Sequence, residues 1–148
     1  METYSEPLKI RWADIDANRH LRHSVYYDFA AAMRMNYLNS KGLTTEKLIE
    51  WQVGPILFRE EALFKREVKL EDKVSIDFKI LRCMPDYSRW SLQHHVTKAD
   101  GTICTIINVD GAWMDLLKRK LTIPNEFIQS IFAEIPKSPE FQFLIPKA

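Results

Sequence analysis

The residues best suited to chemistry are crowded into one short stretch near the N-terminus. Asp14, Asp16, Asn18 and His20 occupy every second position there. A carboxylate beside an imidazole or an amide can act as a general base or as a nucleophile. Aspartates that precede a helix are also common in turns and caps. The residue types alone therefore leave a catalytic and a structural interpretation open.

Other side chains in the sequence have metal-binding chemistry. His20 and His23 lie close to the aspartates, and His94 and His95 are adjacent. Adjacent residues on a strand point to opposite faces, so His94 and His95 do not easily share a metal ion. We expect no metal and no cofactor. The four glycines are scattered and no serine or cysteine lies in a nucleophile motif, which argues against a phosphate loop and against serine or cysteine catalysis.

The composition is that of a compact protein and argues against polyanionic partners. Of the 148 residues, 46% are hydrophobic and 28% are charged. The 21 lysines and arginines balance the 20 aspartates and glutamates, so we expect neither nucleic acid nor a membrane as a partner. The length fits a single domain over residues 1–148, with a core at about residues 6–133 and a C-terminal extension over 134–148.

The cysteines and the N-terminal residues bear on location. Cys83 and Cys104 lie in strand-like segments without the paired spacing of metal or redox sites, so we expect buried, reduced thiols. Residues 1–8 are polar and acidic, unlike a signal peptide, and no uncharged segment approaches the length of a membrane span. These features predict a cytoplasmic protein.

Helical periodicity begins directly after the acidic stretch. Apolar residues recur at helical spacing from Ser24 onward. They predict a helix of about four turns that begins at His23 or Ser24 and ends in the polar segment 39–42. A short second helix is expected after a capping Thr44 or Thr45.

The remaining apolar residues alternate with the period of strands. They predict strands within residues 8–12, 56–64, 74–80, 90–96 and 103–114, with a hairpin turn at Asp100-Gly101. Glu60 and Glu61 interrupt one strand, which indicates a bulge or an exposed edge, or alternatively a second carboxylate at a subunit interface. A final helical turn or two is expected after Pro124, and irregular chain after Pro136.

The order of these elements predicts an α+β fold. A strand, a long helix, a short helix and a series of strands joined by short turns imply an antiparallel sheet packed against one main helix. Periodicity alone leaves several α+β layouts open.

The segment at residues 11–27, RWADIDANRHLRHSVYY, resembles the signature of hotdog-fold acyl-CoA thioesterases, the 4-hydroxybenzoyl-CoA thioesterase family. In particular, Asp16, Asn18 and His20 match the Asp-x-Asn-x-His form of thioesterases that act on fatty acyl carriers. Tyr26 matches the aromatic residue in the first turn of the family's long helix. The sequence departs from the family at Arg22 and His23, where two asparagines are frequent, and this difference bears on acyl-group preference.

The resemblance implies a hotdog fold, in which an antiparallel sheet wraps around one long central helix, and hydrolysis of an acyl thioester to free acid and thiol. Because a thiol with a pKa of about 8.5 leaves as the thiolate, one carboxylate can suffice. Asp16 would be the base or nucleophile, with His20 as the second catalytic residue. The start of the helix would supply oxyanion donors. The substrate-binding residues would be Asn18, His23, Ser24, Val25 and Tyr26.

Several functions stay open beside an acyl-CoA thioesterase. They are an acyl-carrier-protein thioesterase, a hotdog hydratase or dehydratase, and a non-catalytic module that binds acyl thioesters. The hydratase motif usually places its histidine one residue farther from the aspartate than His20 lies from Asp16. The resemblance also implies homodimers or homotetramers with active sites at subunit interfaces. Surface cations could bind the phosphates of CoA or could simply form solvated faces, and none of them is preferred: Arg59, Lys65, Arg66, Lys118, Arg119 and Lys120.

Overall fold

The computed structural model describes residues 3–145, and the strands among them form one sheet. The strands are β1 (Ser5–Pro7), β2 (Val53–Phe64), β3 (Val74–Asp77), β4 (Lys79–Cys83), β5 (Arg89–Lys98), β6 (Ile103–Asp115), β7 (Lys120–Leu121) and β8 (Lys137–Phe143). The helices are a 3₁₀ turn (Trp12–Asp14), α1 (Val25–Ser40), α2 (Thr45–Trp51) and α3 (Glu126–Glu134).

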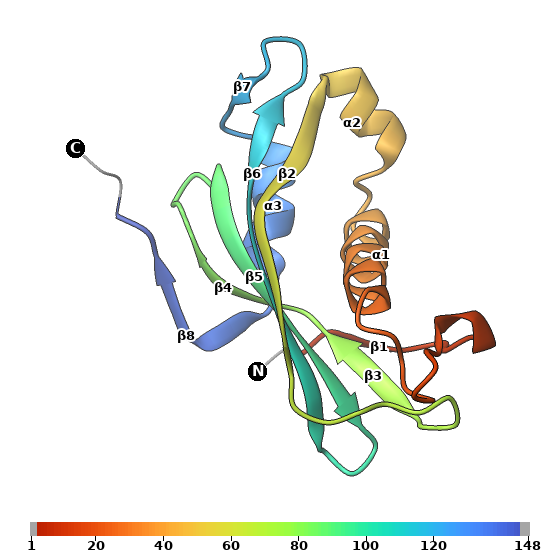
Figure 1. Ribbon diagram of the computed structural model, residues 1–148. Coiled ribbons are helices and arrows are strands. Elements are labelled where there is room, and N and C mark those ends of the chain that lie inside the picture. The colour runs from red at the N-terminus through yellow and green to blue at the C-terminus, as the bar shows by residue number, and fades with distance from the viewer. Residues whose placement is uncertain (1–2, 146–148) are drawn as a thin grey trace.

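The sheet is almost entirely antiparallel and curls around α1. Strand β5 pairs with β6 on one side and with β3 and β4 on the other, while β6 pairs with β2. Figure 1 shows the long strands nearly edge-on, with α1 against one face. This is the hotdog arrangement, and the prediction of an α+β hotdog fold is confirmed. Within residues 3–145, β6 is the one partner of β2, so the other edge of β2 is unpaired.

The predicted helix boundaries agree with the structure. Helix α1 ends at Ser40, and Gly42 follows with a φ of 92°, a conformation that glycine adopts without strain. Thr44 caps α2 by accepting a hydrogen bond from the Lys47 N–H at 3.2 Å. Ser24 lies at the N-cap position of α1, but its side chain makes no capping hydrogen bond.

The predicted strand at residues 8–12 is wrong. Strand β1 lies earlier, and Trp12 begins the 3₁₀ turn with 79% of its surface exposed. The buried carboxylate of Asp14 accepts hydrogen bonds from the backbone N–H and the guanidinium of Arg11. These local bonds fold the chain into a turn although the apolar residues alternate.

Two further expectations are corrected. The predicted strand 74–80 is divided at Phe78 into β3 and β4, which pair with successive parts of β5. The segment after Pro136, expected to be irregular, forms β8 and pairs in parallel with β4. Its pairing with a distant strand carries no signal in its own proline-spaced sequence. Both cysteines are buried and free, as predicted.

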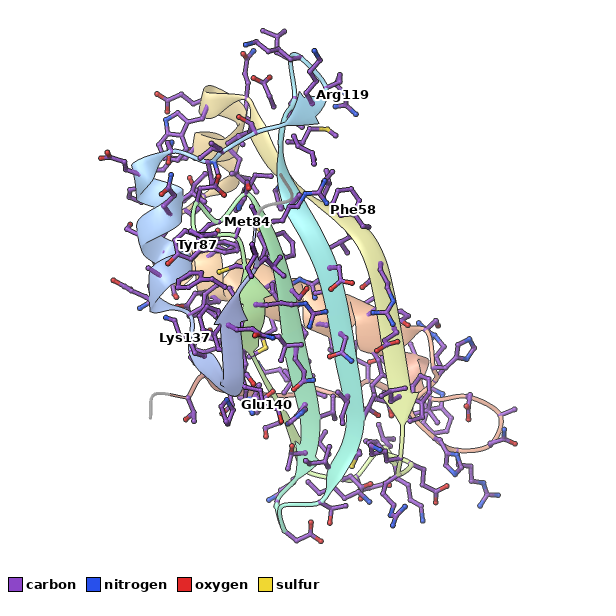
Figure 2. The ribbon with its side chains drawn as sticks, turned by 90° about the vertical axis from the view of Figure 1, so that its left-hand side faces the viewer. Phe58, Met84, Tyr87, Arg119, Lys137 and Glu140 are labelled. Carbon is purple, nitrogen blue, oxygen red and sulfur yellow. The ribbon has the colours of Figure 1, made fainter. Side chains whose placement is uncertain are left out.

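The predicted irregularity in β2 is a β-bulge. The register of β2 against β6 shifts between Leu57 and Arg59, which leaves Phe58 as the additional residue. Figure 2 shows the face of the sheet opposite α1, with Phe58 labelled on β2. After the bulge, Glu60 pairs with Val109 and therefore shares the face toward α1, whereas Arg59 forms ion pairs on the opposite face.

Candidate active site

The acidic stretch forms a tight loop that is fixed by its own backbone. The N–H of Asp16 donates to the carbonyl of His20 at 2.8 Å, and the N–H of Arg19 donates to the carbonyl of Asp16 at 3.0 Å. Arg19 adopts a φ of 65°, which closes the turn. Asp14 is fully buried, and hydrogen bonding to Arg11 holds the pKa of its carboxyl below the ordinary value. Asp14 therefore has a structural role at the base of the loop.

The carboxylate of Asp16 is held in one orientation by the loop. Its Oδ1 accepts hydrogen bonds from the backbone N–H groups of Asn18 at 2.9 Å and His20 at 3.1 Å. Within residues 3–145, its Oδ2 receives no hydrogen bond. The side chain is partly exposed. One oxygen thus anchors the group while the other is available to water or substrate.

The imidazole of His20 contacts a residue that the sequence did not indicate. Its Nε2 lies 2.7 Å from Oε2 of Glu67, in the loop that follows β2. That loop is attached to the acidic loop by a hydrogen bond from the N–H of Leu21 to the carbonyl of Val68 at 2.7 Å. His20 therefore orients Asp16 through its backbone N–H, and its ring is oriented by Glu67. Glu67 is far away in sequence and lies in no motif, so only the folded chain shows it.

Two adjoining concavities meet at these residues. A cavity of about 750 Å³ is lined by Asp16, Asn18, His20 and Glu67, among others. A groove of about 280 Å³ continues past Asp16, His20 and Glu67 to side chains at the start of α1 and at the end of β2. They are His23, which precedes α1, Tyr26 of α1, Phe64 of β2, and Lys65 and Arg66, which follow β2. Five of the seven predicted site residues therefore line one continuous region. The side chains of Ser24 and Val25 line neither concavity.

The start of α1 is more fully hydrogen-bonded than the sequence suggested. The N–H of Val25 donates to the carbonyl of Arg22 at 3.2 Å, and the side chain of Val25 is buried in the core. The Oγ of Ser24 accepts a hydrogen bond from Nε of Arg22 at 3.0 Å. Any oxyanion donors of the first turn must then come from Tyr26 onward.

Tyr26 forms the wall between this groove and the core. Its side chain is buried, and its ring meets the ring of Phe64 edge-on with centroids 5.3 Å apart. Burial raises the pKa of the Tyr26 hydroxyl, so the group stays protonated near neutral pH. It can donate a hydrogen bond but not serve as a base.

Residues 3–145 contain neither a cluster of metal ligands nor a membrane-spanning helix. No three His, Cys, Asp or Glu side chains in this range are arranged to hold a metal ion. His94 and His95 lie on opposite faces of β5, where His94 contacts Arg34 and His95 lies 3.8 Å from Asp77. None of the described helices has the length and hydrophobicity needed to cross a membrane.

The fold and the acidic loop together define the class. The model of the thioesterase-like superfamily matches residues 10–132. The chain therefore belongs to the thioesterase-like superfamily. A sequence search of curated proteins gives no significant match.

Solved structures share the fold at low sequence identity. A 1,4-dihydroxy-2-naphthoyl-CoA thioesterase from Synechocystis is 13% identical with a TM-score of 0.79, and the match covers 90% of this chain and 97% of that one. A Staphylococcus aureus protein solved in complex with CoA is 20% identical with a TM-score of 0.80, covering 98% and 96%. A Lactobacillus plantarum protein described as an oleoyl thioesterase is 17% identical with a TM-score of 0.82, covering 99% of this chain but 55% of that one. At these identities the comparison shows the fold.

Proposed function

We propose that this protein is an acyl-CoA thioesterase in which Asp16 is the general base or the nucleophile. The observation that carries the proposal is the geometry of Asp16: Oδ1 is anchored by two N–H groups and Oδ2 is available beside a large cavity. Membership of the thioesterase-like superfamily supports the reaction type. The solved complex of a similar fold with CoA supports CoA as the carrier.

Either route needs only the one carboxylate. As a general base, Asp16 takes a proton from water while the water oxygen bonds to the thioester carbon. The oxyanion that forms accepts hydrogen bonds from the first turn of α1, and the C–S bond then breaks to release the thiolate, which takes up the proton. As a nucleophile, Asp16 bonds to the same carbon, expels the thiolate and is freed when water hydrolyses the mixed anhydride.

A second copy of the chain completes the site in this proposal. The unpaired edge of β2 has exposed Leu57 and Phe58 in its middle and exposed Leu63 and Phe64 at its end. If two β2 strands pair antiparallel about a two-fold axis, the Phe64 end of one lies beside the Pro55 end of the other. The Asp16 groove of one subunit then faces the partner's α1 and β2. We propose a homodimer on this basis, and a homotetramer would be a dimer of such dimers.

The CoA portion has a suitable surface beside Asp16. Lys65 and Arg66 line the same groove and can neutralise phosphates at its rim. Acyl carrier protein presents the same phosphopantetheine thioester, so it is the alternative carrier. The two free, buried cysteines support a location in the reducing cytoplasm as part of the proposal.

Release of free thiol from a panel of thioesters tests the function. The panel contains acyl-CoAs from acetyl to palmitoyl, benzoyl-CoA, and acyl carrier protein loaded with the same acyl groups. Asp16→Asn retains an oxygen for the two N–H donors but loses the base, so kcat/KM should fall about 10²–10⁴-fold.

Asp100→Asn is the matched control, because Oδ1 of Asp100 similarly accepts the N–H of Thr102 at 2.9 Å in an exposed hairpin turn. Its activity should equal that of the wild type. Full activity of Asp16→Asn would overturn the proposed role of Asp16. Binding of acyl-CoA without turnover by the wild type would favour a non-catalytic module. Addition of water to an enoyl thioester, or elimination of water from a hydroxyacyl thioester, would favour a hydratase or dehydratase.

A further inference from the structure

A second pocket lies between α1 and the sheet, away from the Asp16 loop. It has a volume of about 200 Å³ and shares no lining residue with the cavity or the groove at Asp16. Its walls include Ala31 and Arg34 of α1, Leu57 of β2, Trp90 of β5 and Trp113 of β6. Arg34 lies nine residues beyond the start of α1, a distance of ~14 Å along the helix.

Arg34 is a cation in an apolar setting, and no carboxylate contacts it directly within residues 3–145. Its Nη1 lies 3.0 Å from Nε2 of His94, and Nδ1 of His94 lies 2.8 Å from the carbonyl of Asp77. A carbonyl only accepts, so Nδ1 carries the proton and Nε2 accepts from Arg34. Burial lowers the pKa of His94 to about 3, and the imidazole is therefore neutral near pH 7.

The two tryptophans of the pocket add unpaired donors. Trp113 is fully buried and Trp90 is 3% exposed, and neither indole N–H has a hydrogen-bond partner within residues 3–145. Indole and guanidinium groups donate and cannot accept. The two indole N–H groups are thus donors that lack acceptors, and Arg34, which donates from Nη1 to His94, has further guanidinium N–H groups to offer. Buried donors of this kind are costly unless a ligand supplies the acceptors.

We propose that this pocket binds the acyl group of the substrate and that Arg34 selects acyl groups that carry a carboxylate at their far end. A plain hydrocarbon chain would need no cation at the end of its pocket and would leave the partly buried charge of Arg34 without an ion-pair partner. The pocket volume of about 200 Å³ suits a short dicarboxylic monothioester such as adipyl-CoA.

The position of the pocket agrees with the proposed dimer. The inference rests on the proposed function, because that function places the thioester beside Asp16. Pro55 and Leu57 line the pocket on β2, and antiparallel pairing places the Pro55 end of the strand beside the partner's Phe64. An acyl group could then extend from the thioester at one subunit's Asp16 into the other subunit's pocket.

Glu60 is the carboxylate of the chain itself that could compete with a ligand carboxylate for Arg34. It lies on the face of β2 toward α1, it is exposed, and its negative charge favours the charged form of Arg34. Removing it should not weaken carboxylate binding if Arg34 faces the ligand. It therefore provides a control variant on the same surface.

Binding of two matched thioethers tests the inference without requiring turnover. S-(5-carboxypentyl)-CoA and S-hexyl-CoA differ only in a terminal carboxylate or methyl group, and tryptophan fluorescence reports binding because Trp90 and Trp113 line the pocket. The wild type should bind the carboxylate about tenfold or more tightly, as expected of a charge-assisted hydrogen bond. Equal affinities, or a preference for S-hexyl-CoA, would overturn the inference.

Variants of Arg34 isolate its contribution. Arg34→Met retains the length of the side chain without its charge, so the preference should disappear or reverse, while Arg34→Lys should retain part of it. Glu60→Gln should retain the full preference or increase it. A carboxylate preference that persists in folded Arg34→Met, checked by circular dichroism, would contradict the role of Arg34.

Turnover separates this inference from the proposed function. If adipyl-CoA is hydrolysed with a higher kcat/KM than hexanoyl-CoA, both are supported. If neither is hydrolysed but the thioether preference depends on Arg34, the pocket assignment holds and the thioesterase proposal fails. If both are hydrolysed at equal kcat/KM and the thioethers bind equally, the thioesterase proposal holds and the pocket assignment fails.

Discussion

The Asp16 loop and the Arg34 pocket hold their charged side chains in opposite ways. Asp16 is partly exposed and is anchored by N–H groups two and four residues away. Arg34 lies in an apolar pocket, and its partner His94 is 60 positions away in the sequence. Water and local geometry stabilise the first charge, whereas the second depends on the packing of α1 against β5. Substitutions in the Arg34 pocket should therefore lower the free energy of unfolding more than substitutions in the Asp16 loop.

The largest effect on stability is expected from the acid titration of His94. Its pKa is about 3 in the folded protein against an ordinary value of 6.5, so the unfolded chain takes up the proton first as pH falls. The stabilisation is complete above pH 6.5 and is lost as pH falls from 6.5 toward 3. Between pH 7 and pH 4 the free energy of unfolding should decrease by about 3 kcal/mol from this group alone.

Urea unfolding of His94→Gln at both pH values measures this contribution. The glutamine can still accept from Arg34, but it does not titrate, so the pH-dependent loss should shrink by about 3 kcal/mol. His95→Gln is the control at a site that is 20% exposed. An unchanged pH dependence in His94→Gln would show that the imidazole is not buried as a neutral acceptor.

A smaller effect is expected from crowding Trp90. A Cβ at Gly111 would lie 2.3 Å from Cη2 of Trp90 and 2.4 Å from the carbonyl of Ile56, so Gly111 permits the indole to cross β6. Gly111→Ala should reduce the free energy of unfolding by about 1–3 kcal/mol and weaken binding in the pocket. Gly54→Ala, where the new Cβ would meet Leu116 at 3.4 Å, should cost less. Equal losses of unfolding free energy in Gly111→Ala and Gly54→Ala would contradict a special role of Gly111 beside Trp90.

The same contrast explains what the sequence could predict. The fold followed from periodicity and from the resemblance of residues 11–27, and Asp16, Asn18 and His20 meet in one loop because their contacts are local. Glu67, Arg34 and His94 were missed because tertiary packing brings them into place. The 3₁₀ turn at Trp12 was missed because the local hydrogen bonds between exposed Arg11 and buried Asp14 override the alternating pattern.

The smallest effect on stability is expected from the pair of His20 and Glu67, which lies at the Asp16 loop. Both side chains are substantially exposed, at 35% and 50%, so Glu67→Gln should change the free energy of unfolding by less than ~1 kcal/mol. If Glu67 orients the His20 ring beside the substrate, kcat/KM should still fall several-fold. A loss of stability comparable with that of Gly111→Ala would mean that the loop contact is structural.

The proposed shared site predicts that a heterodimer of two inactive variants contains one intact active site. In such a site, Asp16 of one subunit acts on an acyl group bound between α1 and the sheet of the other. Asp16→Asn removes the base, and Ala31→Trp fills the pocket that Ala31 lines. In a heterodimer of these two variants, one site carries both substitutions and the other carries neither.

Thiol release by that purified heterodimer, obtained with two affinity tags, is the decisive test of the shared site. Both homodimers should be almost inactive, and the heterodimer should recover about half of the wild-type activity through its one intact site. A heterodimer as inactive as its parents would rule out the shared site, because Asp16 would then serve the pocket of its own chain.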